Sequence, residues 1–154
     1  MKIYCEMKDK VRAYNIRVYG ILLNKEKELL LSNEVLNGKR FTKLPGGGHE
    51  LGEGLIDGLK REFEEELNIE INAVEHFYTT DYFQQSAFNA EEQLISVYYL
   101  VESIQAEQIK SGRSAADDEN NSFFWKKLAD LTQDSVSFPV DQLVLKKLKT
   151  KDLL

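Results

Sequence analysis

A chain of 154 residues, 42% of them hydrophobic, is long enough for one domain with a substantial core, and we expect residues 1–154 to form that single domain. The net charge of −6 and the scattered lysines and arginines argue against a general nucleic-acid-binding surface. The first residues hold no long apolar stretch, and no run of about eighteen apolar residues occurs, so neither a signal peptide nor a membrane span is indicated and a cytoplasmic protein is expected.

The first half of the chain has the pattern of strands that lead into a glycine turn. Cys5, the single cysteine, excludes an internal disulfide and is expected in an N-terminal strand or tail. Residues 14–23 and 28–32 are rich in β-forming side chains, and the polar segment 24–27 between them predicts a hairpin. A short strand is expected at residues 41–44.

Pro45 and the three glycines that follow it predict a turn. Successive glycines allow positive φ angles and let the backbone approach a ligand closely. His49 follows in the loop after this turn and could contact a phosphate.

The segment after the turn predicts an amphipathic helix with clustered carboxylates. Glu62, Glu65 and Glu66 are spaced i, i+3 and i+4, so a helix brings them to one face. A separate apolar stripe should pack on the core; it consists of Leu55, Leu59, Phe63 and Leu67.

The second half adds strands and a final helix. Residues 70–83 predict a long or bulged strand, residues 84–92 a polar loop, and residues 94–101 a central, buried strand because they are almost continuously apolar. A last short strand is expected at 123–126, and a helix from Ser137 to about Leu148.

The carboxylate cluster favours a divalent cation. Two carboxylates about 5.5 Å apart repel by roughly 3 kcal/mol at an effective dielectric constant of about 20. Oxygen ligands without partnering His or Cys favour Mg²⁺, Mn²⁺ or Ca²⁺. Mg²⁺ commonly takes one or two carboxylates together with substrate phosphates, which suits a short acidic ridge beside an open pocket. A solvated acidic helix face is the alternative for three glutamates taken alone.

The order of residues from Gly47 to Ile69 resembles the signature of the Nudix hydrolase family. Gly47 is followed after five residues by Glu53, after seven more by Arg61-Glu62-Phe63, and then by Glu65-Glu66. One position departs: Asn68 stands where the family has glycine. Because this position ends the helix in a left-handed conformation, for which Asn is the usual second choice, the departure threatens little.

The resemblance implies the α/β Nudix fold, an α/β/α sandwich with a mixed β-sheet, and hydrolysis of a nucleoside diphosphate linked to another group. It implies Mg²⁺ or Mn²⁺ held by Glu62, Glu65 and Glu66, with Glu53 assisting. A backbone carbonyl of the glycine turn would join the metal ligands, and Gly46 is the nearest match. Arg61 matches the arginine that orients a carboxylate; for Glu53 and Arg61, helix capping and a surface ion pair are the alternatives.

The general base stays open between several glutamates. Glu119 lies in the acidic run 117–119, much as a loop glutamate does in the enzymes that hydrolyse oxidised nucleoside triphosphates; a solvated loop is the alternative. The other candidates are Glu66, Glu91 and Glu92.

Substrate recognition is expected outside the signature. Ser137-Phe138-Pro139 is similar to the region of the oxidised-nucleotide enzymes in which a following polar side chain contacts the base, which points to Asp141 or Gln142. Asp141 could instead simply favour the dipole of its helix. Tyr82, Phe83 and Trp125 could stack on a base, although aromatic residues at strand positions more often belong to the core.

The resulting prediction is a Mg²⁺-dependent pyrophosphohydrolase with a small nucleotide substrate, without nucleic-acid or membrane partners. Nucleoside triphosphates, normal or oxidised, ADP-ribose and nucleotide sugars remain open, and a homodimer is possible. The alternative is a Nudix-like sensor that binds a nucleotide without cutting it. The retention of all signature glutamates speaks against that alternative.

Overall fold

Two four-stranded sheets lie between two helices in the computed structural model, which describes residues 2–116 and 118–151. The strands are β1 Ala13–Leu22, β2 Glu28–Leu36, β3 Lys39–Lys43, β4 Gly46–Gly48, β5 Asn72–Thr79, β6 Glu92–Glu102, β7 Arg113–Ser114 and β8 Asn121–Lys127. The α-helices are α1 Lys2–Lys8, α2 Leu55–Leu67 and α3 Pro139–Thr150. Short 3₁₀ turns are η1 Ala106–Gln108, η2 Leu128–Asp130 and η3 Gln133–Ser135.

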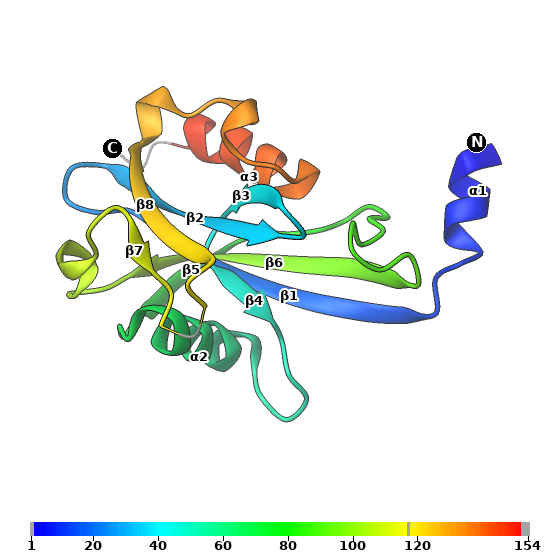
Figure 1. The fold of residues 1–154 in the computed structure, drawn as a ribbon, viewed down its shortest axis with the longest axis horizontal. Coiled ribbons are helices and arrows are strands. Elements are labelled where there is room, and N and C mark those ends of the chain that lie inside the picture. Colours follow the sequence, from blue (N-terminus) through cyan, green and yellow to red (C-terminus); the bar gives the residue numbers. More distant parts are fainter. Residues whose placement is uncertain (1, 117, 152–154) are drawn as a thin grey trace.

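The first sheet has the strand order β4-β1-β6-β5 and is mixed, because β1 and β6 run parallel. The second has the order β3-β2-β8-β7 and is antiparallel. Helix α2 covers one side of these strands and α3 the other, which gives the expected α/β/α arrangement (Figure 1). The structure adds the second sheet to the single mixed sheet that was expected.

Of the predicted hairpin between β1 and β2, the turn is present but the extended pairing of the two strands is not. Only the bridge between Leu23 and Leu29 joins their ends, and the two strands belong to different sheets. β2 instead pairs with β8 from Glu28 to Glu34. β2 is buried on both faces, because Leu30 enters the core on the α2 side while Leu29 and Leu31 enter the core on the α3 side. It therefore lies in the centre of the molecule, between β3 and β8 rather than beside β1.

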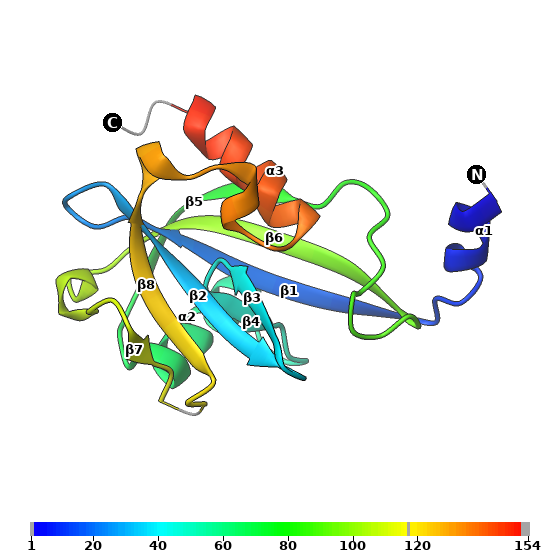
Figure 2. The same ribbon diagram turned by 45° about the horizontal axis from the view of Figure 1, so that its top comes forward.

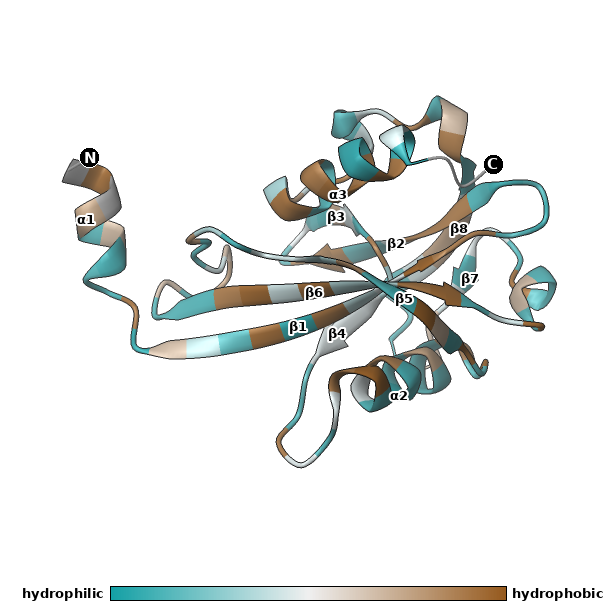
Figure 3. Ribbon diagram, turned by 180° about the vertical axis from the view of Figure 1, so that it is seen from behind, coloured by the Kyte–Doolittle hydropathy of each residue, from teal (hydrophilic) through white to brown (hydrophobic). Residues whose placement is uncertain are grey.

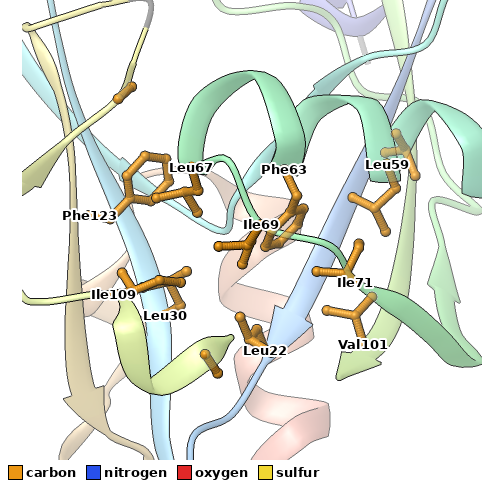
Figure 4. Close-up of a cluster of buried hydrophobic side chains, with 13 residues drawn as sticks. Leu22, Leu30, Leu59, Phe63, Leu67, Ile69, Ile71, Val101, Ile109 and Phe123 are labelled. Atoms are coloured by element: carbon orange, nitrogen blue, oxygen red, sulfur yellow. The ribbon is translucent and has the colours of Figure 1, made fainter. Parts of the chain in front are cut away.

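Helix α2 is positioned by its apolar stripe. Leu59, Phe63 and Leu67 are fully buried, while Leu55 at the start of the helix is half-buried. The side chains of Leu59, Phe63 and Leu67 belong to the core cluster that also contains Leu30 (Figure 4). Burial of each such side chain stabilises the fold by about 1.5–3 kcal/mol, which fixes the rotation of the helix about its axis. Hydrophilic residues occupy its other faces (Figure 3).

The end of α2 follows the prediction for Asn68. This residue has φ 54° and ψ 43°, the left-handed conformation, and its backbone N–H donates to the carbonyl of Glu64. The side chain of Asn tolerates this region better than most L-residues, so the helix ends where the family's glycine would end it.

The glycine turn is an edge strand. β4 pairs antiparallel with β1, and Gly46 has φ 149°, where a Cβ would lie 2.0 Å from the carbonyl oxygen of Val18. Only glycine fits that position.

The remaining predicted strands are present, β6 in the interior of its sheet and β5 with two bulges. The N-terminal segment differs from the expected strand or tail. Helix α1 stands apart from the other elements beyond the N-terminal start of β1, in both views (Figures 1 and 2), and Cys5 on it is exposed. Among the described residues, no helix is long and apolar enough to cross a membrane.

Candidate active site

The polar face of α2 carries a chain of carboxylates joined by one arginine. The side chain of Glu62 is 14% exposed and that of Glu65 is 51% exposed. Arg61 Nη1 donates to Glu62 Oε1 at 3.1 Å and to Glu65 Oε2 at 3.2 Å. One guanidinium nitrogen therefore holds two of the three clustered glutamates of α2 close together.

The same guanidinium fixes the loop before the helix. Arg61 Nε donates to Glu53 Oε2 at 3.0 Å and Nη2 to Glu53 Oε1 at 2.8 Å, a two-point ion pair. Nη2 also donates to the carbonyl of Gly48 at 3.0 Å. Arg61 thus ties α2, the loop and the edge strand β4 together, as a positioning residue would.

Burial and hydrogen bonding shift the two central carboxylates in opposite directions. The hydrogen bonds from Arg61, followed by the backbone N–H of Glu50, lower the pKa of Glu53 to about 2. The pKa of Glu62 is raised, because burial outweighs the attraction of Arg61. A carboxylate that is costly to ionise without further positive charge is suited to binding a cation.

Glycines allow these carboxylates to approach the backbone. A Cβ on Gly47 would lie 2.5 Å from the Glu62 carboxyl group, and one on Gly58 would lie 2.6 Å from Glu53 Oε1. His49 holds the same loop, since its Nε2 lies 2.6 Å from the carbonyl oxygen of Glu53.

The carbonyl of Gly46, the predicted backbone metal ligand, faces away from β1. The β1–β4 hydrogen bonds involve Pro45 O and His49 N, so alternation along the strand turns the Gly46 and Gly48 carbonyls outwards. Gly46 O accepts a hydrogen bond from Lys43 Nζ at 3.3 Å. Among the described residues, no three His, Cys, Asp or Glu side chains already form a cage for an ion.

A cavity of about 140 Å³ opens on the other face of the mixed sheet. β1, β3 and β6 supply its floor, residues 84–88 one side, and the start of α3 another. Its polar lining includes Arg17, Glu34, Lys43 and Asp141. The cavity and the carboxylates of α2 therefore lie on opposite faces of the mixed sheet.

Asp141, a predicted base-contacting residue, lies in the wall of this cavity. It is 2% exposed and accepts a hydrogen bond from the Tyr98 hydroxyl at 2.5 Å. Burial raises its pKa to about 6, although the hydrogen bond from Tyr98 opposes this rise. Gln142, the alternative candidate, donates its side-chain amide to the carbonyl of Val136 at 3.2 Å and is not part of the cavity lining.

The aromatic residues at the cavity differ from those that the sequence suggested. Phe138 and Phe88 line it, and Phe138 stacks on Phe41 with ring centroids 5.6 Å apart. Trp125 packs on the α2-side core, and its indole N–H donates to Ile109 O at 2.7 Å. Tyr82 and Phe83 line a separate shallow hollow near α1.

The candidate bases occupy different parts of the molecule. Glu119 is exposed in a turn before β8, and the bond from Ala116 N–H to the Glu66 carbonyl, 2.9 Å long, brings this loop to the end of α2. Asp117 lies outside the described residues. Glu92 begins β6, with Glu91 just before it, and the backbone of Glu92 lies four residues along the strands from the end of β4; the Glu92 carboxylate accepts a hydrogen bond from Asn15 at 3.0 Å.

Four further residues line the cavity that no sequence motif indicated: Arg17, Tyr19, Lys43 and Tyr98. The sequence pattern could have indicated Arg17. Arg17 interrupts an apolar run, and because alternate residues of a strand face the same side, it shares a face with Tyr19 and Ile21, which enter the α3-side core. A charge at an inward-facing strand position indicates a polar cavity.

A protein-family model and several solved structures match the chain. The family model of the NUDIX domain matches residues 13–148. No curated protein matches the chain.

Among solved structures, the fold is similar to the MutT protein from Methanosarcina mazei Go1, with a TM-score of 0.69 and 17% identity over 93% of this chain and 98% of that one. It is also similar to a MutT NUDIX hydrolase from Burkholderia pseudomallei, with a TM-score of 0.66 and 20% identity over 88% and 98%. An ADP-ribose pyrophosphatase from Streptococcus suis gives a TM-score of 0.56 and 14% identity over 90% and 93%. At such identities the likeness establishes the fold.

Proposed function

The chain belongs to the NUDIX domain family, and from that premise we propose that it is a Mg²⁺- or Mn²⁺-dependent hydrolase. It cleaves the pyrophosphate bond of a nucleoside diphosphate linked to another group. The observation that carries the proposal is the set of carboxylates around Arg61, held against a glycine edge strand and next to a cavity. Nucleoside triphosphates, ADP-ribose and nucleotide sugars all contain the required bond.

The oxygen donors on α2 fit a hard divalent ion. Glu62 and Glu65 lie within 3.2 Å of one cationic nitrogen, so both can face a single positive charge. Glu66 on the same face and the outward carbonyl of Gly46 would complete the ligands, with substrate phosphates taking the remaining positions. The bound ion would neutralise phosphate oxygens and lower the pKa of an attacking water.

The residues of the chain position this chemistry. Arg61 forms ion pairs with Glu53 and Glu62 and donates to the Gly48 carbonyl, so these carboxylates would be ordered before substrate binds. Preorganised charges need no rearrangement as charge develops during bond cleavage. The nucleoside would occupy the cavity, where Asp141 could contact the base and Phe138 and Phe88 could pack on it.

The first experiment is a hydrolysis panel with Mg²⁺, Mn²⁺ or chelator. It contains normal and oxidised nucleoside triphosphates, ADP-ribose, nucleotide sugars and dinucleoside polyphosphates. Metal-dependent release of a nucleoside monophosphate would support the proposal. Absence of turnover together with metal-dependent thermal stabilisation by one compound would favour the nucleotide-binding sensor.

Glu62→Gln tests the ridge directly. We expect turnover to fall at least a hundredfold, because a metal ligand is lost. The melting temperature near neutral pH should stay equal or rise, because a half-buried negative charge is removed. The matched control is Glu64→Gln, which changes an exposed residue on another face of the same helix and should leave turnover within twofold. Equal activity of the two variants would remove Glu62 from the mechanism.

Glu119→Gln separates the loop base from a base on α2. If Glu119 accepts the proton from water, turnover should fall by two to four orders of magnitude with little change in KM. Turnover near that of the wild type would leave Glu66 as the base candidate. Asp118→Asn in the same turn is the control for a change of loop charge.

A further inference from the structure

Arg17 lines the cavity next to the glycine strand β4, across the sheet from the clustered glutamates of α2 (Glu62, Glu65 and Glu66). On β1 it is opposite Gly48 of the edge strand, and its neighbour Val18 is opposite Gly47. Gly47 is the residue against which Glu62 packs, whereas Arg17 Nη1 lies 3.5 Å from the position of a Cβ on Gly48. Arg17 and Glu62 therefore flank the same short edge strand, one from each face of the sheet.

The edge strand between these two sides has no side chains of its own. β4 consists only of glycines, and the side chains of Lys43 and Arg61 reach it at the carbonyls of Gly46 and Gly48. A phosphate chain that starts in the cavity could pass over the edge and reach the glutamates of α2. Arg17 and Lys43 are the positive charges of the cavity lining on this side of the edge.

Only one of the three guanidinium nitrogens of Arg17 donates a hydrogen bond to another described residue. Its Nε donates to the Tyr19 hydroxyl at 3.1 Å, and its Cζ lies 5.9 Å from the centroid of the Tyr19 ring. No atom of the described residues accepts a hydrogen bond from Nη1 or Nη2, although the side chain lines the cavity. The Tyr19 contact orients the fork and leaves its two terminal nitrogens facing an open space.

The other cation of the cavity is already occupied. Lys43 is 4% exposed, its Nζ lies 3.2 Å from Glu34 Oε1, and it donates to the carbonyl of Gly46. Burial alone would lower the pKa of Arg17, but Tyr19, Glu62 and Glu34 raise it, so the guanidinium stays charged. Arg17 is thus the cation available for an anionic ligand.

We propose that Arg17 binds the phosphate next to the nucleoside of the substrate through its Nη1 and Nη2 atoms. A planar fork with two donors matches the two oxygens of a phosphate group. This inference rests on the proposed function for the identity of the anion. It assigns the substrate's orientation: nucleoside in the cavity, first phosphate on Arg17, and the following phosphate at the α2 glutamates.

The test measures binding of nucleoside 5′-monophosphates and of the matching nucleosides in chelator, by calorimetry, so that neither metal nor turnover contributes. Arg17→Gln should weaken monophosphate binding about ten- to hundredfold and leave nucleoside binding within twofold. Arg17→Lys, which keeps the charge but loses the fork, should be intermediate. Arg12→Gln is the matched control, because Arg12 is exposed on the approach to the same strand and lies outside the cavity lining.

A second measurement needs no variant. In the wild-type protein the Arg17 Nε–H resonance, assigned through its own side-chain carbons, should shift on titration with the monophosphate and not with the nucleoside. This result would support the site even if Arg17→Gln failed to fold. Equal shifts with both compounds would overturn it.

Failure of this inference is distinguishable from failure of the proposed function. Hydrolysis by the wild type with an unchanged KM and unchanged monophosphate affinity in Arg17→Gln would overturn the role of Arg17 and leave the enzyme intact. Loss of monophosphate affinity in Arg17→Gln without turnover of any compound by the wild type would support the phosphate site and reject hydrolysis. A wild type that binds monophosphate and nucleoside equally would overturn the inference.

Discussion

Asp141 combines two residue-scale properties, burial in a cavity wall and a position in the first turn of α3. The helix N-terminus favours its negative charge, as do the Tyr98 hydroxyl, the backbone N–H of Leu44 and the nearby cations Lys43 and Arg17. Burial nevertheless dominates and raises the pKa to about 6. The protonation state of Asp141 therefore changes between weakly acidic and neutral pH, where it could accept or donate a hydrogen bond.

This shift predicts a pH-dependent effect of Asp141→Asn on stability. Because the pKa is higher in the folded than in the unfolded chain, the stability linked to Asp141 is complete below about pH 4 and is lost as pH rises through about 6. The loss amounts to about 3 kcal/mol, from a difference of about two pKa units. Asp141→Asn should thus raise the free energy of unfolding at pH 8 by up to that amount and by only about a third as much at pH 4.5.

Urea unfolding from pH 4.5 to 8 checks this prediction. Asp134→Asn serves as control, since Asp134 is exposed before α3 and should give a flat difference across the range. A constant difference for Asp141→Asn would mean that its carboxyl group ionises in the folded protein as easily as in water.

At the residue scale, the sequence located the carboxylates but not their partners across the sheet. The spacing of Glu62, Glu65 and Glu66 on one helix is a local property, and so is the left-handed position of Asn68. The contact of Arg17 with Tyr19 is also local, but the cavity that both residues line is completed by β6 and α3, which lie far along the chain. The pair of Lys43 with Glu34 depends on the β2–β3 register, which alternation alone did not define.

At the scale of elements, β4 shows how three residues set the distance between a helix and a sheet. Glu62 of α2 packs directly against the Cα of Gly47, and Arg61 bonds to the carbonyl of Gly48. The sequence indicated a turn here, because glycines give no strand signal. In the structure, the absence of side chains on these glycines lets Glu62 approach the backbone, and β4 forms a strand because it pairs with β1.

Gly47→Ala and Gly48→Ala form a matched pair that tests this role. The new Cβ at Gly47 would lie 2.5 Å from the Glu62 carboxyl group and must displace it, whereas the Cβ at Gly48 would make an ordinary contact at 3.5 Å with Arg17 Nη1. Neither glycine has a positive φ, so backbone strain does not separate the two variants. Turnover should fall at least tenfold in Gly47→Ala, and its free energy of unfolding by about 1–3 kcal/mol.

Gly48→Ala should keep both quantities close to those of the wild type, with turnover within threefold. Activity measured on whichever compound the panel identifies, together with urea unfolding, decides the outcome. Equal turnover in the two variants would show that Glu62 does not need its position against Gly47.

At the scale of the whole molecule, the layers could be predicted and the strand partners could not. The α/β/α arrangement was implied by the resemblance to the Nudix family, and the order of the expected strands and helices agreed with it. Which strands pair depends on contacts distant in sequence, and here β1 and β2 separate into two sheets after a single bridge. The separation places the cavity where the sheets diverge, lined by β1 and β6 of one sheet and by β2 and β3 of the other.

Lys43 connects the two sheets at this point. It lies on β3, pairs with Glu34 on β2, and its Nζ lies 5.5 Å from the Tyr19 ring centroid on β1 of the other sheet. Burial alone would lower its pKa, yet Tyr19 and Glu34 raise it above the ordinary value. The ion pair is asymmetric, because the side chain of Lys43 is 6% exposed and that of Glu34 is 35% exposed.

The asymmetry predicts the order of effects in a double-mutant cycle. Glu34→Gln leaves a buried ammonium without its ion-pair partner and should lower the free energy of unfolding by about 2–3 kcal/mol, whereas Lys43→Met leaves a carboxylate that water still reaches and should lower it by about 1–2 kcal/mol. The double variant should be more stable than the sum of the single changes predicts, by at least 1 kcal/mol. Urea unfolding at pH 7 measures all four proteins, with Lys60→Met as the exposed control. If Lys43→Met proved the more damaging single change, the contacts of Lys43 with Tyr19 and the Gly46 carbonyl, rather than its pairing with Glu34, would hold the two sheets together.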